Sequence, residues 1–362
     1  MAFSNPLVSL VNIQYPIVQA PMVGVSTPEL AAAVSNAGAL GSIGIGASST
    51  EKAREMIVAT RALTDKPFNV NVFCHRAAVP DPEREADWLN HLKPIFEEFK
   101  AAPPSDLAAP YRSFNEDRST LDMLLEERPA VVSFHFGLPP VEWVQALRDA
   151  GIVTFGCATT AEEALMVEAS GVDAIVAQGA EAGGHRGVFE PEEGDQQLGI
   201  LPLTRLISAS SRVPVIAAGG IMDGQGINAV LELGAAGAQL GTAFILSTES
   251  GANEAYREVI KSKRSRDTQI TSVISGRPAR GISNRIHAEI DPMNAPVVPD
   301  YPIAYAAGKA LATAATAKGS QEFSAHWAGQ GAPLAREISA SELIETLVRE
   351  LGDARGSGFF DS

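Results

Sequence analysis

At 362 residues, the chain is long enough for one large α/β barrel with an appended lobe, or for two ordinary domains. Its 28 basic and 43 acidic residues give a net charge of −15, which argues against nucleic-acid binding because that function needs a basic surface. Two cysteines, Cys74 and Cys157, predict no disulfide framework, and no apolar run reaches membrane-spanning length. We therefore expect a cytoplasmic enzyme, with a locally positive pocket if its substrate is an anion.

Eight short apolar runs predict buried strands. In chain order they are Ile17–Ala20, Ala39–Ile43, Phe68–Phe73, Ala130–Phe134, Ile152–Phe155, Ala174–Ala177, Pro214–Ala218 and Ala238–Gly241. Helical patterns separate most of them, for example Pro28–Asn36 after an N-cap at Thr27, and Ala161–Ser170 after Thr159 or Thr160. This alternation predicts a TIM (β/α)8 barrel. A doubly wound sheet is less favoured, because no strand is followed by a GxGxxG loop and a helix.

Two segments are too long to be ordinary βα loops. Residues 75–128 follow the third strand, and residues 247–335 form a long, mostly helical excursion after the eighth. Long loops in compact domains are commonly functional lids. We therefore expect residues 247–335 to form a second lobe over the C-terminal mouth of the barrel.

The amphipathic pattern Ser341–Leu351 predicts the eighth barrel helix, capped by Ser339 or Ser341. The barrel would then comprise residues 1–246 and 336–362. Within it, we expect the tail from Gly352 to Ser362 to be disordered.

Glycines follow the seventh and eighth strands, on the barrel face that carries active sites. Gly219 and Gly220 end one strand, and Gly241 and Thr242 end the next. Backbone N–H groups at such positions can surround a phosphate, helped by the dipole of the following helix. The pattern predicts a phosphate-bearing ligand, which is either a phosphosugar or flavin mononucleotide (FMN).

A glycine-dense loop, Gln178–Gly187, follows the sixth strand and carries His185. This imidazole is either an acid/base or hydrogen-bonding group, or a solvated side chain in a tight turn. Asn71 and Gln178 end strands and could meet the edge of a flat heterocycle, although such amides more often hold loop backbone. His135, which ends the fourth strand, points into the barrel mouth or belongs to the core, and we assign it no role.

These residues and motifs resemble the nitronate monooxygenase family, also called the 2-nitropropane dioxygenase family. The similarity covers nearly the whole chain, at Gln19–Met22, Asn71, Gln178–Gly187, Ala218–Ile221 and Gln239–Thr242. The resemblance implies non-covalent FMN in a TIM barrel, and it places the family's catalytic histidine at His185. Together with the strand-end positions, it gives as candidate FMN contacts Met22, Asn71, Gln178, Gly183, Gly219, Gly220, Gln239, Leu240, Gly241 and Thr242.

The segment Pro299–Lys309 is similar to the bacterial, or class I, subgroup of that family. On a helix, Tyr301, Tyr305 and Lys309 would share one face, although an ordinary amphipathic helix gives the same spacing. Tyr111 and Tyr256 also fall at subgroup positions. The expected substrate-binding residues are Tyr111, His185, Tyr256, Tyr301, Tyr305 and Lys309.

The resemblance implies oxidation of propionate 3-nitronate, and of other alkyl nitronates, by O2. The expected products are malonic semialdehyde with nitrite or nitrate, formed through an anionic flavin semiquinone. His185 would donate a hydrogen bond to the nitronate and act as a base only toward neutral nitroalkanes.

Two other functions suit the same barrel. One is an FMN-dependent reductase that takes hydride from NAD(P)H and passes it to a quinone or an enoyl thioester. The other is a non-catalytic barrel that binds a phosphorylated ligand. We expect no metal, because the sequence contains neither HExxH nor a Cys/His cluster with ligand spacing.

Overall fold

The computed structural model describes residues 5–291 and 295–356. Eight parallel strands form its central sheet: β1 (Ile17–Gln19), β2 (Gly41–Gly44), β3 (Phe68–Phe73), β4 (Val131–His135), β5 (Val153–Ala158), β6 (Ala174–Gln178), β8 (Val215–Ala218) and β9 (Gly237–Leu240). Their order is β1-β9-β8-β6-β5-β4-β3-β2. A parallel bridge between Val18 and Leu40 joins the two outer strands, so that the sheet closes on itself. The predicted TIM barrel is confirmed.

All eight predicted strands are present, and their ends shift by no more than three residues. The prediction for β3 matches at both ends, whereas β2 begins at Gly41 instead of Ala39 and β5 continues to Ala158. β5 is extended because Ala158 still pairs with Ala177 of β6, a contact between strands that the local sequence pattern does not contain.

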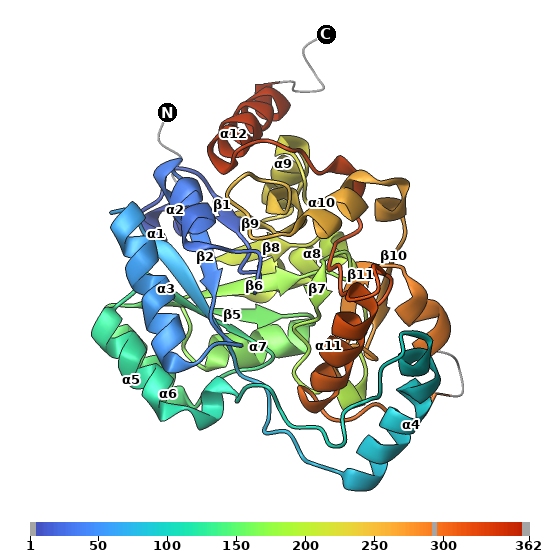
Figure 1. Cartoon of the computed structure of the whole chain (residues 1–362). Coiled ribbons are helices and arrows are strands. Elements are labelled where there is room, and N and C mark those ends of the chain that lie inside the picture. Colours follow the sequence, from blue (N-terminus) through green and yellow to red (C-terminus); the bar gives the residue numbers. More distant parts are fainter. Residues whose placement is uncertain (1–4, 292–294, 357–362) are drawn as a thin grey trace.

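Among the described residues, nine helices lie around the barrel (Figure 1): α1 (Pro6–Val11), α2 (Pro28–Asn36), α3 (Thr50–Leu63), α5 (Arg118–Glu127), α6 (Val141–Asp149), α7 (Ala161–Ala169), α8 (Ile200–Ser210), α9 (Gly224–Glu232) and α12 (Ala340–Gly356). The Thr27 side chain caps α2 by accepting from the N–H of Leu30, as expected. For α7, the cap is Thr160, whose hydroxyl accepts from the N–H of Glu163.

The last helix, α12, starts with a capping box. The Ser339 hydroxyl accepts from the N–H of Glu342, and the Glu342 carboxylate accepts from the N–H of Ser339. The helix continues to Gly356, so the expected disorder from Gly352 is wrong for residues 352–356; residues 357–362 lie outside the described chain. Leu351 is buried, and burial of this face outweighs the cost of about 1 kcal/mol for one glycine in a helix.

The segment 247–335 contains strands as well as helices. Its main helical elements are α10 (Glu254–Lys261), a π-helical turn (Ile286–Ile290) and α11 (Ile303–Thr316). Its strands, β10 (Thr268–Thr271) and β11 (Ala279–Ile282), pair antiparallel, and β11 also pairs with β7 (Gly184–His185). Sequence analysis did not predict this small sheet, because its short strands lack an apolar run.

The first insertion, residues 75–128, also contributes to the lobe. Its helix α4 (Pro82–Glu98) packs against α11 (Figure 1), with Trp88 and Phe96 in the same buried cluster as Leu311. The division into a barrel and a lobe of residues 247–335 stays a prediction. Within the first insertion, α4 packs against that lobe, whereas α5 belongs to the barrel.

Two glycines test the packing of α2 on β2 and the length of α12. A Cβ at Gly41 would lie 1.9 Å from the backbone oxygen of Ala31 in α2, whereas a Cβ at Gly352 would have no neighbour within 4 Å. We expect Gly41→Ala to lower the free energy of unfolding by about 3 kcal/mol through overpacking. Gly352→Ala should raise it by about 0.5 to 1 kcal/mol, because α12 includes this residue.

Urea unfolding followed by circular dichroism measures both changes. Equal stability of Gly41→Ala and the unmodified protein would contradict the close packing of α2 on β2. A destabilised Gly352→Ala variant would contradict a helix that continues through this position.

Candidate active site

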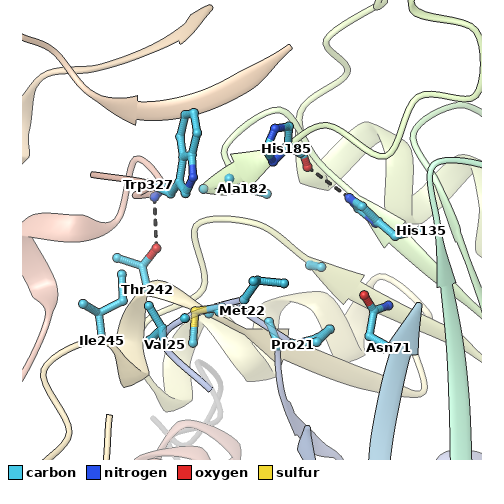
Figure 2. Close-up of a pocket in the computed structure, with 18 of the residues that line it drawn as sticks. Pro21, Met22, Val25, Asn71, His135, Ala182, His185, Thr242, Ile245 and Trp327 are labelled. Atoms are coloured by element: carbon cyan, nitrogen blue, oxygen red, sulfur yellow. Dashed lines mark hydrogen bonds between the residues drawn. The ribbon is translucent and has the colours of Figure 1, made fainter. Parts of the chain in front are cut away.

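A cavity of about 400 Å³ opens at the carboxyl ends of the barrel strands. Figure 2 shows Trp327 and His185 on one side of it and Met22 and Asn71 on the other. The candidate residues that line the cavity are Met22, Asn71, Tyr111, Gln178, Gly183, His185, Gly219, Gly220, Gln239, Gly241, Thr242, Tyr256, Tyr305 and Lys309. Most of the predicted site residues are therefore brought together.

Two candidates do not line the cavity. The Leu240 side chain is buried in the barrel core. Tyr301 is also buried, and its hydroxyl lies 2.8 Å from that of Tyr111, which does line the cavity. Any role of Tyr301 in binding is therefore exerted through neighbours that line the cavity, such as Tyr111 and His185, whose ring centroid lies 5.6 Å from that of Tyr301.

The two glycine-rich strand ends form one corner of the cavity. Gly220 has a φ of +69°, a left-handed conformation that favours glycine. Within the described residues, the N–H groups of Gly220 and Gly241 donate to no protein acceptor. Because free amides and the nearby start of α9 attract anions, this corner fits the phosphate of a cofactor.

Asn71 offers an acceptor at the cavity wall. Its Nδ2 donates to the backbone oxygen of Ser133 at 3.1 Å and to the Ser133 hydroxyl at 2.9 Å. Since a carbonyl oxygen only accepts, these bonds fix the orientation of the amide. The Oδ1 atom therefore remains available for an N–H group of a ligand.

The side chain of Gln178 holds the loop that follows β6. Its Oε1 accepts from the N–H of Gly187 at 2.8 Å and from the guanidinium of Arg186 at 3.1 Å, and its Nε2 donates to the backbone oxygen of His185 at 3.0 Å. Arg186 is fully buried and pairs with Asp195 at 2.7 Å. Gln178 therefore holds the loop backbone, which is the structural role considered for it, and it also lines the cavity.

His185 lies on β7, where it pairs with Ala279 of β11. Its Nε2 is 2.8 Å from the hydroxyl of Ser275, and its ring centroid is 5.2 Å from that of Trp327. Desolvation lowers the pKa of His185 to about 3, and the neighbouring positive charge of Arg277 adds to the effect. At neutral pH the ring is uncharged, with one N–H donor and one acceptor.

His135 lines the cavity below His185. Of the two alternatives considered for it, it therefore points into the barrel mouth. Its Nε2 donates to the backbone oxygen of His185 at 3.2 Å (Figure 2). Because that oxygen can only accept, the bond places the proton on Nε2. Desolvation lowers the pKa of His135 to about 4, so this ring is also uncharged at neutral pH.

The tyrosines surround the lobe side of the cavity, with one correction to the expected helix. The helix α11 begins at Ile303, after Pro302, so Tyr301 precedes it and only Tyr305 and Lys309 share a helical face. Burial raises the pKa of the four phenols, which therefore remain protonated donors: Tyr111, Tyr256, Tyr301 and Tyr305.

Lys309 carries the only cationic side chain among the described residues that line the cavity, and none of these residues is Asp or Glu. Its Nζ lies 4.6 Å from the ring centroid of Tyr305 and 6.0 Å from that of Tyr111. Partial burial lowers the pKa of Lys309. In a protein with a net charge of −15, the cavity is locally suited to an anion.

Sequence analysis missed the segment 325–331, which also lines the cavity. The N–H of Gly329 donates to the Thr242 hydroxyl at 3.0 Å, and the Tyr256 hydroxyl donates to the backbone oxygen of Trp327. A Cβ at Gly329 would lie 2.7 Å from the backbone oxygen of Glu181. The two glycines of Gly329-Gln-Gly331 signal such close backbone approach, but they follow no strand and so received no role.

Two kinds of feature are absent from residues 5–291 and 295–356. In these ranges, no helix combines the length and the apolar character needed to cross a bilayer. The same residues contain no group of three or more His, Cys, Asp or Glu side chains placed to hold a metal ion.

Comparison with solved structures extends the description of the fold. Nitroalkane oxidase from Streptomyces ansochromogenes aligns with a TM-score of 0.88 at 39% identity, over 97% of this chain and 99% of that chain. FabK from Thermotoga maritima aligns with a TM-score of 0.72 at 29% identity, over 97% of both chains. The barrel and its lobe are therefore shared with known proteins.

Sequence comparison identifies the family. The family model described as nitronate monooxygenase matches residues 4–350. A nitronate monooxygenase from Pseudomonas aeruginosa is 60% identical over 342 residues, which cover 94% of this chain and 97% of that protein. A nitronate monooxygenase from Paraburkholderia phytofirmans is 55% identical over 345 residues, covering 95% and 94%. The chain belongs to the nitronate monooxygenase family of flavin-dependent enzymes.

Proposed function

We propose that this enzyme uses FMN and O2 to oxidise propionate 3-nitronate, and other alkyl nitronates, to malonic semialdehyde (from propionate 3-nitronate) plus nitrite or nitrate. The observation that supports this most directly is the cavity that joins a phosphate corner to Lys309, with no carboxylate among its described lining residues. Such a cavity suits an anionic substrate beside a phosphorylated cofactor. We also propose a cytoplasmic location, which accords with the two free cysteines.

The residues present fit FMN. Gly220 and Gly241 would hold its phosphate through their free N–H groups, and Asn71 would accept from its ring system. When bound, FMN supplies the electron transfer to O2, which amino-acid side chains do not provide.

The protein residues would bind and orient the substrate. Lys309 would pair with its carboxylate, and the phenols of Tyr111, Tyr256 and Tyr305 would donate hydrogen bonds. His185, neutral at physiological pH, would donate its one N–H to the nitronate oxygen, while its Nε2 accepts from the Ser275 hydroxyl. A nitronate has already lost its carbon proton, so the low pKa of His185 does not impede this reaction, whereas it makes His185 a weak base toward neutral nitroalkanes.

Oxygen consumption by the purified, flavin-loaded enzyme tests the proposal. We expect rapid uptake with propionate 3-nitronate and none with NADH alone, because the proposed reaction needs no reduced nicotinamide. Reduction of the flavin by NADH without oxygen, together with no uptake on nitronate, would instead identify a nicotinamide-dependent reductase. Protein that remains colourless after FMN is added would favour a non-catalytic barrel.

His185→Asn should retain FMN but lower kcat/KM for propionate 3-nitronate by about 100-fold, as expected for the loss of one positioned donor. Flavin absorbance after gel filtration and steady-state oxygen uptake measure the two effects. His91→Asn is the matched control, because His91 does not line the cavity. Unchanged kcat/KM in His185→Asn would remove His185 from the reaction.

Lys309→Met and Tyr305→Phe should raise KM for propionate 3-nitronate more than they lower kcat, because both groups contact the substrate before and during reaction. We expect an increase of about tenfold or more for Lys309→Met. Lys318→Met is the control, since Lys318 is exposed after the end of α11. Normal KM in both site variants would place the substrate pocket elsewhere.

A further inference from the structure

Arg277 carries a buried positive charge that the site described so far does not use. It lies in the turn between β10 and β11, and only 3% of its surface is exposed. Its guanidinium donates to the backbone oxygens of Val188 and Phe189, and its Nε has no partner. Arginine does not lose its proton in proteins, so the charge is permanent.

No acidic side chain in the described parts of the chain forms an ion pair with Arg277. The nearby carboxylates of Glu192 and Asp300 both pair with Arg76, each at 2.6 Å. The carboxylates of Glu192 and Glu190 interact with this charge electrostatically without pairing with it, so the charge is only partly compensated and its burial remains costly. An interaction between this charge and a bound anion would explain why the protein retains Arg277.

The charge lies directly behind the aromatic wall of the cavity. The Arg277 Cζ atom is 4.6 Å from the ring centroid of Phe136 and 5.8 Å from that of Tyr301. Phe136 lines the cavity, and its ring centroid is 5.6 Å from that of His185. One aromatic layer therefore separates the guanidinium from the space beside His185.

The backbone holds this arrangement closely. Gly276, next to Arg277, has a φ of +94°, and a Cβ there would lie 2.6 Å from the backbone oxygen of Pro299 and 2.8 Å from the backbone nitrogen of Tyr301. The N–H of Arg277 also donates to the hydroxyl of Ser275 at 3.3 Å, the same hydroxyl that contacts His185. The position of the charge is thus tied to that of the imidazole.

We propose that Arg277 is a positioning residue whose permanent charge draws the nitronate end of the substrate to His185, while Lys309 takes the carboxylate. Lys309 contacts different rings, those of Tyr305 and Tyr111, so the two cations mark two walls of the cavity. This inference rests on the proposed function, because it assumes a substrate with two negative charges. With His185 uncharged, Arg277 supplies the positive potential on its side of the cavity.

A ligand series that varies charge at constant shape separates this role from simple packing. Succinate, succinamate and succinamide carry two, one and no negative charges, and their dissociation constants can be measured by calorimetry on the flavin-loaded enzyme. Arg277→Gln removes the charge and keeps a donor for the backbone oxygens, and Arg277→Met removes both.

We expect Arg277→Gln and Arg277→Met to weaken succinate binding by about 10- to 30-fold, as for the loss of a unit charge several ångströms away in a protein interior. Binding of succinamate should weaken less, and binding of succinamide by less than about twofold, because succinamide carries no charge. If Arg277→Met does not fold, Arg277→Gln carries the comparison.

Kinetics with two nitronates tests the orientation. Arg277→Gln should raise KM for propyl-1-nitronate and for propionate 3-nitronate by similar factors, whereas Lys309→Met should raise it only for the carboxylated substrate.

Equal weakening of all three succinate derivatives would show a packing role and overturn the proposal. So would unchanged succinate affinity in Arg277→Gln, or no succinate binding by the unmodified enzyme. If the charge series holds while no nitronate is oxidised, the proposed function fails and the anion site remains.

Discussion

The arrangement of the site depends on how the loop after β6 is held. The Gln178 amide bonds to the backbone of His185 and Gly187, and the buried pair of Arg186 with Asp195 fixes the segment that follows β7. The short strand β7 then pairs with β11 of the lobe. Because His185 lies on β7, one set of hydrogen bonds both places the imidazole and joins the barrel to the lobe.

A second feature is the distribution of charge. The protein has a net charge of −15, yet no described residue lining the cavity is acidic. Two histidines that line the cavity, His135 and His185, and a third beside Tyr301, His75, have pKa values lowered mainly by desolvation. These histidines therefore add no positive charge at neutral pH, whereas the charge of the Arg277 guanidinium does not depend on pH in this range.

The barrel and its phosphate corner could be predicted from the sequence because their signals are local. An apolar run followed by glycine, as at Gly219 and Gly220, carries its meaning within a few residues. The same holds for Lys309 and Tyr305, which share a face because they are four residues apart on α11. Predictions of this kind require only the spacing of residue types within a short segment.

Other parts of the site arise from contacts between distant segments. β7 is two residues long and exists only because β11, almost one hundred residues later, pairs with it. Trp327 and Gly329 are held at the cavity by hydrogen bonds to Tyr256 and Thr242. The sequence alone does not show that Arg277 lacks an acidic partner, because the neighbouring carboxylates pair with another arginine. No periodicity or local motif encodes such relations.

The place of α12 has a consequence for folding. The chain leaves the barrel after β9 and returns only at α12, which packs against α9 and α2. Docking α12 therefore closes a loop of about 100 residues, with an entropic cost on the order of 4 kcal/mol if that loop is unstructured. A lobe that is already compact brings its two ends close together and reduces this cost. The lobe that contributes residues to the cavity thus also helps α12 to dock on the barrel.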